Sequence, residues 1–284
     1  MRTPSDDRGV ALLNVLAVVA VASAAALMMV VTQEQALDRS TAYREATQAL
    51  TFARGGELSA VAALRRDMAE APAVDHAREP WAQVEDEGVA IRDGRFTLRV
   101  EDAQSRFNIN ALVSSSPVGV GGLTRVLAAA RLPPSYLEPL RLYVQANGPL
   151  GSPAELAGAG LPATALERLT PLLTALPPDA GVNVNSASAE VLGALLSNPV
   201  AGRLLVNRRE ATGFLTPADF EAIGVLTTPE MGFTSDHYRV VTEVEFRDGR
   251  QRLVSLLRRR RVAGQPDVVV IRRTREAAGE DRAR

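Results

Sequence analysis

An uncharged run near the N-terminus constrains this chain more than any other feature of its sequence. No residue in 10–31 carries a charge. A helix over this run would be ~33 Å long at the usual rise per residue, which is enough to cross the hydrocarbon core of a bilayer. The run therefore predicts a helix that crosses a membrane once.

Three kinds of N-terminal segment contain such a run: a cleaved signal peptide, a plain membrane anchor and a type IV pilin-like leader with its helix. A signal peptide has an apolar core of only about 7–15 residues, and this run continues past that length through Met28 and Met29. The short polar leader MRTPSDDRG favours the third kind, because it resembles the leaders that prepilin peptidase removes by cutting after a Gly. On this resemblance the cut follows Gly9, and Val10 becomes the methylated N-terminus.

The helical pattern continues beyond the uncharged run. Residues 32–69 contain no Pro, and apolar residues recur there at helical spacing, interrupted by Glu57. The apolar residues of this stripe are Tyr43, Ala46, Leu50, Ala53, Val61, Leu64 and Met68. A single helix, half inside and half outside the membrane, has the shape of a pilin spine. The alternative is a membrane anchor followed by a separate amphipathic helix.

Two Asp-Gly pairs predict β-hairpins in segments 89–100 and 238–257. Asp-Gly between alternating runs suits a type I′ turn, whose two central residues both need positive φ. Apolar and polar residues alternate across 238–246, as in a strand with one buried face. The hairpins predict a small antiparallel sheet, and the run 268–271 is a candidate further strand.

The stretch between the hairpins has a different character. It is rich in Ala, Leu and Pro, its apolar residues have helical spacing, and it contains a weak internal repeat. FNINALV at 107–113 resembles VNVNSAS at 182–188, and LGSPAELAGAG at 150–160 resembles FLTPADFEAIG at 214–224. We therefore expect an all-helical insertion between the two halves of the sheet.

These motifs, taken in order, are similar to those of one family. After the Arg-Gly leader and the long spine come EDAQSRFNINAL at 101–112, VNVNSASAEVLGALL at 182–196 and FLTPADF at 214–220. The order resembles the type II secretion minor pseudopilin called general secretion pathway protein K, from Arg8 to about Leu257. The resemblance implies an α+β pseudopilin fold, in which a long N-terminal spine helix packs on a small antiparallel sheet and carries a large helical insertion.

The resemblance and the patterns together predict how the chain is organised. The expected segments are a prepilin leader over 1–9, the transmembrane half of the spine helix over 10–31, the first part of the α/β domain over 32–112, the helical insertion with helix-hairpin-helix-like repeats over 113–232, the second part of the α/β domain over 233–272 and a disordered tail over 273–284.

The resemblance also implies a function. A protein of this family is a non-enzymatic subunit at the tip of the pseudopilus, held in the inner membrane by one helix with its C-terminal domain in the periplasm. It acts with minor pseudopilins I and J, and with other pseudopilins, to start the assembly that exports folded proteins across the outer membrane. The alternatives are a minor pilin of a type IV pilus and a membrane-anchored helix-hairpin-helix DNA-uptake protein.

Asn14 agrees with a tip position. Counted from Val10, it is the fifth residue of the mature chain, where pilins usually have Glu. In a filament that carboxylate pairs with the N-terminal ammonium of the subunit added before it. A tip subunit has no earlier neighbour, so a neutral side chain avoids the cost of a charge in the membrane. A single polar residue near a helix end is also tolerated without such a role.

The DNA-uptake alternative depends on segment 182–220, which resembles a helix-hairpin-helix unit. Such units bind phosphate through backbone N–H groups in a Gly-x-Gly hairpin. The hairpin here is Ser-Asn-Pro-Val, and Pro199 has no N–H. A basic face remains from Arg203, Arg208 and Arg209, but we do not expect nucleic acid as a partner.

Catalysis finds little support in the sequence, and metal ligands are not identified. His76 and His237 are far apart, and the consecutive residues Ser235, Asp236 and His237 cannot converge as a triad requires. There is no Cys to bind zinc. The family resemblance implies calcium in the α/β domain without indicating which residues bind it. The acidic run 85–87 has suitable oxygen ligands, and it also suits a solvated loop.

Four consecutive arginines, at 258–261, end the second strand of the second hairpin. Such a run can bind anionic lipid or an acidic partner, and more often it is a solvated end. We therefore expect these arginines at the surface.

Overall fold

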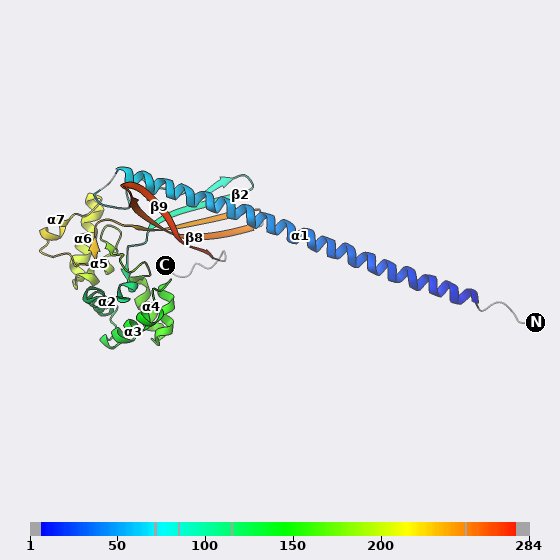
Figure 1. Ribbon diagram of the computed structural model, residues 1–284, viewed down its shortest axis with the longest axis horizontal. Helices are drawn as coiled ribbons and strands as arrows, with labels where there is room; N and C mark the ends of the chain where they lie inside the picture. The colour runs from blue at the N-terminus through cyan, green and yellow to red at the C-terminus, as the bar shows by residue number, and fades with distance from the viewer. Residues whose placement is uncertain (1–6, 71–72, 85, 115, 248, 277–284) are drawn as a thin grey trace, which may run out of the picture.

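A single long helix dominates the shape of the molecule (Figure 1). The computed structural model describes residues 7–70, 73–84, 86–114, 116–247 and 249–276. Helix α1 (Asp7–Glu70) has 64 residues without a break, and its N-terminal half extends far beyond the rest of the chain (Figure 1). It is the one helix among the described residues that is long and apolar enough to cross a membrane, and its most apolar part is not buried. The prediction of one continuous spine is confirmed.

A five-stranded antiparallel sheet packs on the second half of α1. The strands are β1 (Asp86–Ile91), β2 (Gly94–Asp102), β7 (His237–Phe246), β8 (Gly249–Val262) and β9 (Gln265–Glu276), in the order β1-β2-β7-β8-β9. β2 and β7 pair along their whole length, so that Asp102 lies opposite Tyr238. The chain therefore leaves the sheet and returns to it at the same end. The antiparallel sheet, both hairpins and the further strand are confirmed.

The predicted turn type is wrong for the first hairpin. β2 begins at Gly94, so the turn residues are Arg92 and Asp93, and of these two only Asp93 has a positive φ, of 63°. Gly94 is needed for a different reason, because a Cβ there would collide with the carbonyl group of Glu245 on β7. Asp248, in the second hairpin, lies outside the described residues.

β9 is longer than the expected strand. It continues to Glu276, so residues 273–276, expected in a disordered tail, belong to the sheet. Arg273 gives a reason, because its guanidinium donates hydrogen bonds of 2.8 and 2.7 Å to the carboxylate of Glu57 on α1. The rest of the expected tail, 277–284, lies outside the described residues.

One face of the sheet is covered by α1. The buried apolar residues of this layer include Ala49, Ala53, Ala60, Leu64 and Met68 from α1 and Leu98, Val100, Tyr238, Val240, Val244, Leu253 and Leu257 from the strands. Gly56 lets the helix approach closely, because a Cβ there would overlap the ring of Phe96. The alternation predicted for β7 is observed. Burial of these apolar side chains stabilises the packing of α1 on the sheet.

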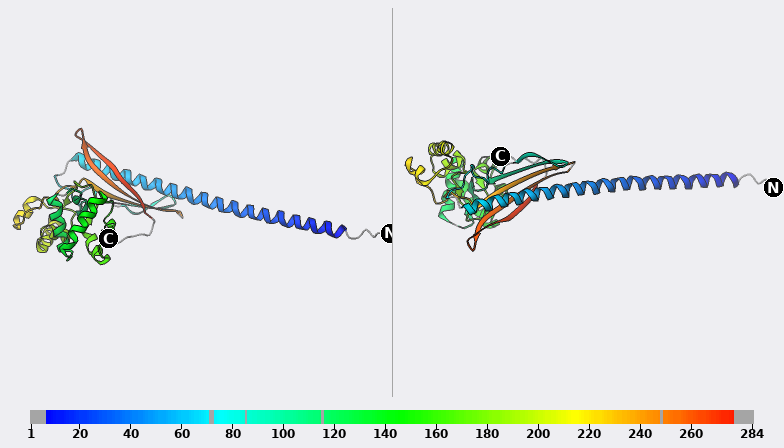
Figure 2. Two further views of the ribbon diagram at one scale, coloured as in Figure 1. Left: turned by 60° about the horizontal axis from the view of Figure 1, so that its bottom comes forward. Right: turned by 90° about the horizontal axis from the view of Figure 1, so that it is seen from above.

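The insertion between β2 and β7 has its own core. Its helices are α2 (Pro117–Ala129), α3 (Leu137–Asn147), α4 (Ala163–Leu169), α5 (Ala189–Leu195), α6 (Pro199–Thr212) and α7 (Pro217–Ala222), with 3-10 turns η1 (Ile109–Leu112), η2 (Pro134–Tyr136), η3 (Pro153–Ala159) and η4 (Thr170–Leu172). Two short parallel pairs join them, β3 (Phe107–Asn108) with β4 (Leu173–Thr174) and β5 (Val182–Asn183) with β6 (Met231–Gly232). The insertion lies at the end of the molecule opposite the N-terminus (Figures 1 and 2).

The two copies of the weak sequence repeat make the same contacts. Asn110 donates to the carbonyl of Leu150 at 2.9 Å and accepts from its N–H at 2.7 Å. Asn185 exchanges the corresponding bonds with Leu215, at 3.2 and 2.6 Å. Each Asn thus fixes the start of the segment that leads to a Pro-initiated helical turn, η3 in one copy and α7 in the other.

Candidate functional site

The predicted N-terminal site residues lie on α1. Gly9, Val10 and Asn14 are all within this helix, which starts at Asp7 and continues through them without a break. Asn14 is exposed, on the part of α1 that contacts no other element. Cleavage after Gly9 and a tip-specific role of Asn14 stay predictions.

The outer surface of the spine is apolar in places. Leu37, Tyr43 and Leu58 of α1 are 67%, 76% and 65% exposed, although Tyr43 belongs to the stripe that the sequence placed on the helix's apolar face. The predicted stripe therefore does not lie wholly against the sheet. Its later residues cover the sheet, but Tyr43 is exposed. This outward surface is suited to packing against another helix.

Three buried acidic side chains attach α1 to the sheet. The pairs are Glu45 with Arg247 (3.9 Å), Glu57 with Arg273 (2.7 Å) and Asp67 with Arg259 (2.8 Å). Burial opposes ionisation of Glu57, but hydrogen bonds from Arg273 and Ser255 outweigh it and hold its pKa below the ordinary value. From the sequence, only Glu57 was recognised, as an interruption of the apolar stripe. The ion pairs could have been suspected because three acids share the sheet-facing side of one helix.

Arg259 corrects the expectation for the run of four arginines. Arg260 and Arg261 are exposed as expected, but Arg259 is only 7% exposed. The alternation of β8 turns its side chain inward, where it binds Asp67 of α1 and Asp75 of the loop after α1. One arginine of the run is thus part of the core rather than of a lipid-binding surface.

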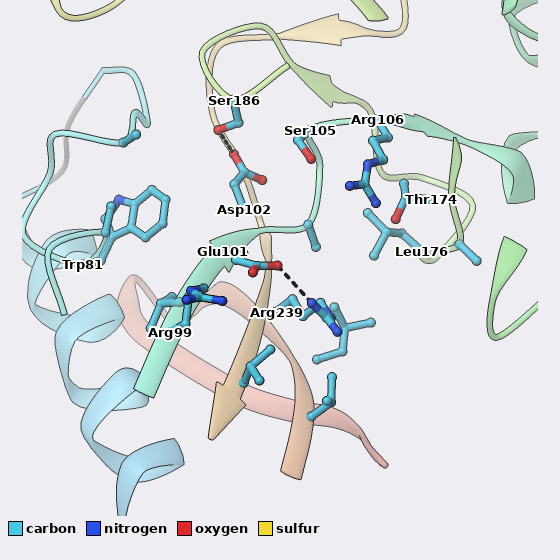
Figure 3. A pocket seen from close by; sticks show the side chains of 18 of the residues that line it. Trp81, Arg99, Glu101, Asp102, Ser105, Arg106, Thr174, Leu176, Ser186 and Arg239 are labelled. Carbon is cyan, nitrogen blue, oxygen red and sulfur yellow. Dashed lines mark hydrogen bonds and ion pairs between the residues drawn. The ribbon is translucent and has the colours of Figure 1, made fainter. Parts of the chain in front are cut away.

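A buried polar hub connects the insertion to the sheet. At the end of β2, Oδ2 of Asp102 accepts hydrogen bonds from Asn183 Nδ2 (2.8 Å), Ser186 Oγ (2.5 Å) and Ser235 Oγ (2.6 Å), and Oδ1 accepts from the N–H of Gln104 (2.8 Å). Burial raises the pKa of Asp102. The hub joins the motif at 101–112 to the motif at 182–196. Figure 3 shows the contact between Asp102 and Ser186.

Gln104 adds a second set of bonds at this junction. Its Oε1 accepts from the N–H groups of Asp236 (2.7 Å) and His237 (3.1 Å), and its Nε2 donates to the carbonyl of Gly181 (3.1 Å). The segments entering and leaving the insertion are therefore bonded to each other and to the insertion itself.

A wide open cleft of about 2000 Å³ separates the outer face of the sheet from the insertion (Figure 3). Charged side chains on its sheet side pair across strands, as Glu101 does with Arg239 at 3.0 Å and Glu243 with Arg252 at 3.1 Å. Such pairs make a polar, solvated surface.

The residues considered for catalysis have other contacts. Ser235 Oγ donates to Asp102 rather than to His237, whose Nδ1 lies 3.2 Å from Gln104 Oε1. His76 stacks on Phe214, with ring centroids 5.2 Å apart. Burial lowers the pKa of both histidines.

The hairpin between α5 and α6 uses its backbone donors internally. The N–H groups of Val200 and Ala201 donate to the side chain of Asn198, both at 3.1 Å. Two arginines of the proposed basic face are also engaged, since Arg208 binds Asp219 and Arg209 donates to carbonyl oxygens of the insertion. The hairpin therefore offers phosphate few of the contacts that DNA binding needs.

Of the acidic run 85–87, only the side chain of Glu87 is described. Glu87 accepts a hydrogen bond of 2.8 Å from Arg99 and is largely exposed, while Glu85 lies outside the described residues. A different group, Asp67, Asp75 and Glu79, has carboxylate oxygens within 4.8 Å of one another. The sequence did not predict this cluster, because its members are spread along a helix end and a loop.

Comparison with known proteins gave consistent matches. The family model for type II secretion system protein K matches residues 182–240. Type II secretion system protein K of Pseudomonas aeruginosa is 31% identical over 296 residues, covering 89% of this chain and 89% of the relative. The protein of the same name from Klebsiella pneumoniae is 28% identical over 257 residues, covering 75% of this chain and 78% of the relative.

A solved structure has the same fold. The complex of GspK, GspI and GspJ from the type II secretion system of enterotoxigenic Escherichia coli contains a chain that matches with a TM-score of 0.66 and 19% identity. The match covers 84% of this chain and 100% of that chain. It identifies the α+β pseudopilin architecture of spine, sheet and insertion.

Proposed function

The chain belongs to the family of type II secretion system protein K, and from this membership we propose that it is the tip subunit of a pseudopilus. Membership makes it a minor pseudopilin of type II secretion, with one apolar N-terminal helix as its membrane anchor. We further propose that the anchor lies in the inner membrane and the folded part in the periplasm. The role is structural and non-enzymatic. We prefer it to the two alternatives, a minor pilin of a type IV pilus and a membrane-anchored DNA-uptake protein.

The position of the insertion carries the proposal. The insertion occupies the end of the molecule opposite the N-terminus (Figure 2), where a subunit added above in a closely stacked shaft would have to fit. The buried bonds of Asp102 and Gln104 hold it there. A firmly held domain of this size blocks further stacking on its own side and has free space only at a tip.

The partners follow from the spine and from the related complex. Tyr43 and Leu58 give neighbouring helices an apolar surface to pack on. The related solved structure is a complex with GspI and GspJ, so we propose the corresponding minor pseudopilins I and J as partners of this chain. Together they start pseudopilus assembly, and other pseudopilins follow below them.

Prepilin peptidase is the proposed processing enzyme. It would remove residues 1–9 by cutting after Gly9, and Val10 would become the methylated N-terminus. The neutral Asn14 then spares the tip subunit an unpaired carboxylate in the membrane, in agreement with the position of the insertion.

Site-specific cross-linking tests the tip position. The chain has no Cys, so a single introduced Cys carrying a photoreactive maleimide reports on one site. Leu58→Cys on α1 is expected to cross-link to a minor pseudopilin in cells that assemble the system. Arg203 is exposed and belongs to α6, which lies at the end of the molecule opposite the N-terminus (Figure 1). Arg203→Cys is the matched variant and is expected to cross-link to no pseudopilin. A product between Arg203→Cys and a major pseudopilin, or a second copy of this chain, would contradict the proposal.

A further inference from the structure

The resemblance to the protein K family implies calcium in the α/β domain, and one acidic cluster among the described residues is a candidate place for it. Asp67 at the end of α1 and Asp75 and Glu79 in the following loop form the one group of three acidic residues, within the described part of the chain, whose oxygens approach one another closely. Their exposed fractions are 5%, 0% and 7%. Several carboxylate oxygens facing one point are what Ca²⁺ prefers.

A guanidinium already lies at that point. Arg259 donates from Nη1 to Oδ2 of Asp67 at 2.8 Å and from Nη2 to Oδ2 of Asp75. Its Nε donates to the carbonyl oxygen of Ser235 at 2.6 Å, and the guanidinium carbon is 5.1 Å from the ring centroid of Tyr238. Calcium needs 6–8 oxygen ligands at close range, and Arg259 stands between the oxygens that would have to supply them. The residues therefore do not fit a calcium ion.

Neutral hydrogen-bond donors stabilise the remaining acidic side chain of the cluster. Oε2 of Glu79 accepts hydrogen bonds from the indole N–H of Trp81 and the backbone N–H of His76, both at 2.8 Å. Burial, followed by the neighbouring Glu79, raises the pKa of Asp67 to about 6, and burial also raises the pKa of Glu79. Oδ1 of Asp75 is buried without a hydrogen-bond partner among the described residues, so it is the least stabilised of the carboxylate oxygens named here.

We propose that Arg259 takes the place of a divalent cation in this cluster, so that the α/β domain of this chain folds and stays folded without calcium. The arginine then supplies the positive charge that a metal ion would supply to the acidic side chains. It joins the end of α1 to the loop that follows and to the start of β7. This inference is independent of the tip position, because it concerns how the domain is held together.

Terbium luminescence tests the proposal directly, because Tb³⁺ binds at calcium sites and is excited by a nearby indole. Trp81 is the single Trp of the chain, and it is hydrogen-bonded to Glu79 of the cluster. The full-length chain in detergent is expected to give no indole-sensitised Tb³⁺ emission. Neither calcium nor EDTA should change its Tm.

Arg259→Ala should reverse both results. The variant is expected to give sensitised emission that calcium abolishes, and calcium at about 100 times its Kd should raise Tm by about 5–10 °C. Arg260→Ala is the matched control, since it removes the adjacent arginine, which is half exposed and pairs with Asp267. The control should behave as the wild type.

Calcium-sensitive Tb³⁺ emission from the wild type, or a fall in its Tm in EDTA, would overturn the proposal. A folded Arg259→Ala that binds neither ion would also overturn it, because the arginine would then not occupy a cation position. Should Arg259→Ala not fold, Arg259→Gln, which retains amide donors, enters the same assay with the same expected result, and the wild-type measurement decides independently.

Discussion

Two buried ionisable side chains lie where separate parts of the chain meet. Arg259 of β8 joins Asp67 of α1 to Asp75 of the next loop. Asp102 of β2 joins Asn183 of the insertion to Ser235 before β7. A buried ionisable group that loses its partner costs several kcal/mol, so we expect both residues to hold their segments together.

The carboxyl of Asp67 should make the protein less stable as the pH rises. Its folded pKa of about 6 lies above the ordinary 3.8, so its contribution is fully present below pH 3.8 and is lost as the pH rises through 6. Asp67→Asn removes this titration while keeping an acceptor for Arg259. Between pH 4.5 and 7 the free energy of unfolding of the wild type should fall by about 2 kcal/mol more than that of the variant.

Denaturant unfolding of the full-length chain in detergent at several pH values measures this difference. Glu138→Gln is a suitable control, because Glu138 lies on the exposed side of α3 and pairs only with Arg141 of its own helix among its described contacts. Parallel pH profiles for the wild type and Asp67→Asn would contradict the assignment of a raised pKa to Asp67.

At the scale of elements, the junction between sheet and insertion is the distinctive structure. The two short pairs β3–β4 and β5–β6 are too small to hold a domain alone. Side chains supply the rest, since Asp102 and Gln104 between them bond to the segments before and after the insertion. These bonds therefore fix the insertion to the end of the sheet.

Removal of the Asp102 carboxylate should loosen the insertion. Asp102→Ala removes an acceptor from four donors, three of them buried and one part-buried, so we expect a loss of at least about 2 kcal/mol in the free energy of unfolding. Hydrogen exchange should rise at the backbone of 181–186. Glu101→Ala is the matched control, because its exposed pair with Arg239 contributes about 1 kcal/mol or less. Equal stability and exchange in the two variants would contradict the role of Asp102.

Local sequence patterns predicted the helices and strands well. They could not predict polar contacts between residues far apart in the chain. The helical stripe and the alternation of 238–246 report on burial along one segment, which is why the spine and β7 could be predicted. The partner of Glu57 is Arg273, 216 positions later in the chain, and no spacing rule connects them. Arg259 was wrongly expected at the surface, because a run of arginines does not indicate which member faces inward.

On the scale of the whole molecule, the parts are arranged along one axis. The apolar half of α1 is at one end, the sheet covers the other half, and the insertion lies beyond the sheet (Figure 1). The sequence predicted this order from the resemblance and the two hairpins. It did not predict that the insertion would be firmly docked, because Asp102 and Asn183 reveal their pairing only once the chain has folded. The docking supports our proposal that the insertion prevents another subunit from stacking above it.

Labelling of the insertion in assembled pseudopili tests the tip position most directly. In cells that overproduce pseudopili, Arg203→Cys provides a single exposed thiol on α6, which is biotinylated and detected with gold in the electron microscope. We predict one label at one end of each filament and none along the shaft. Labels spaced along the shaft, or filaments built from this chain alone, would contradict the account.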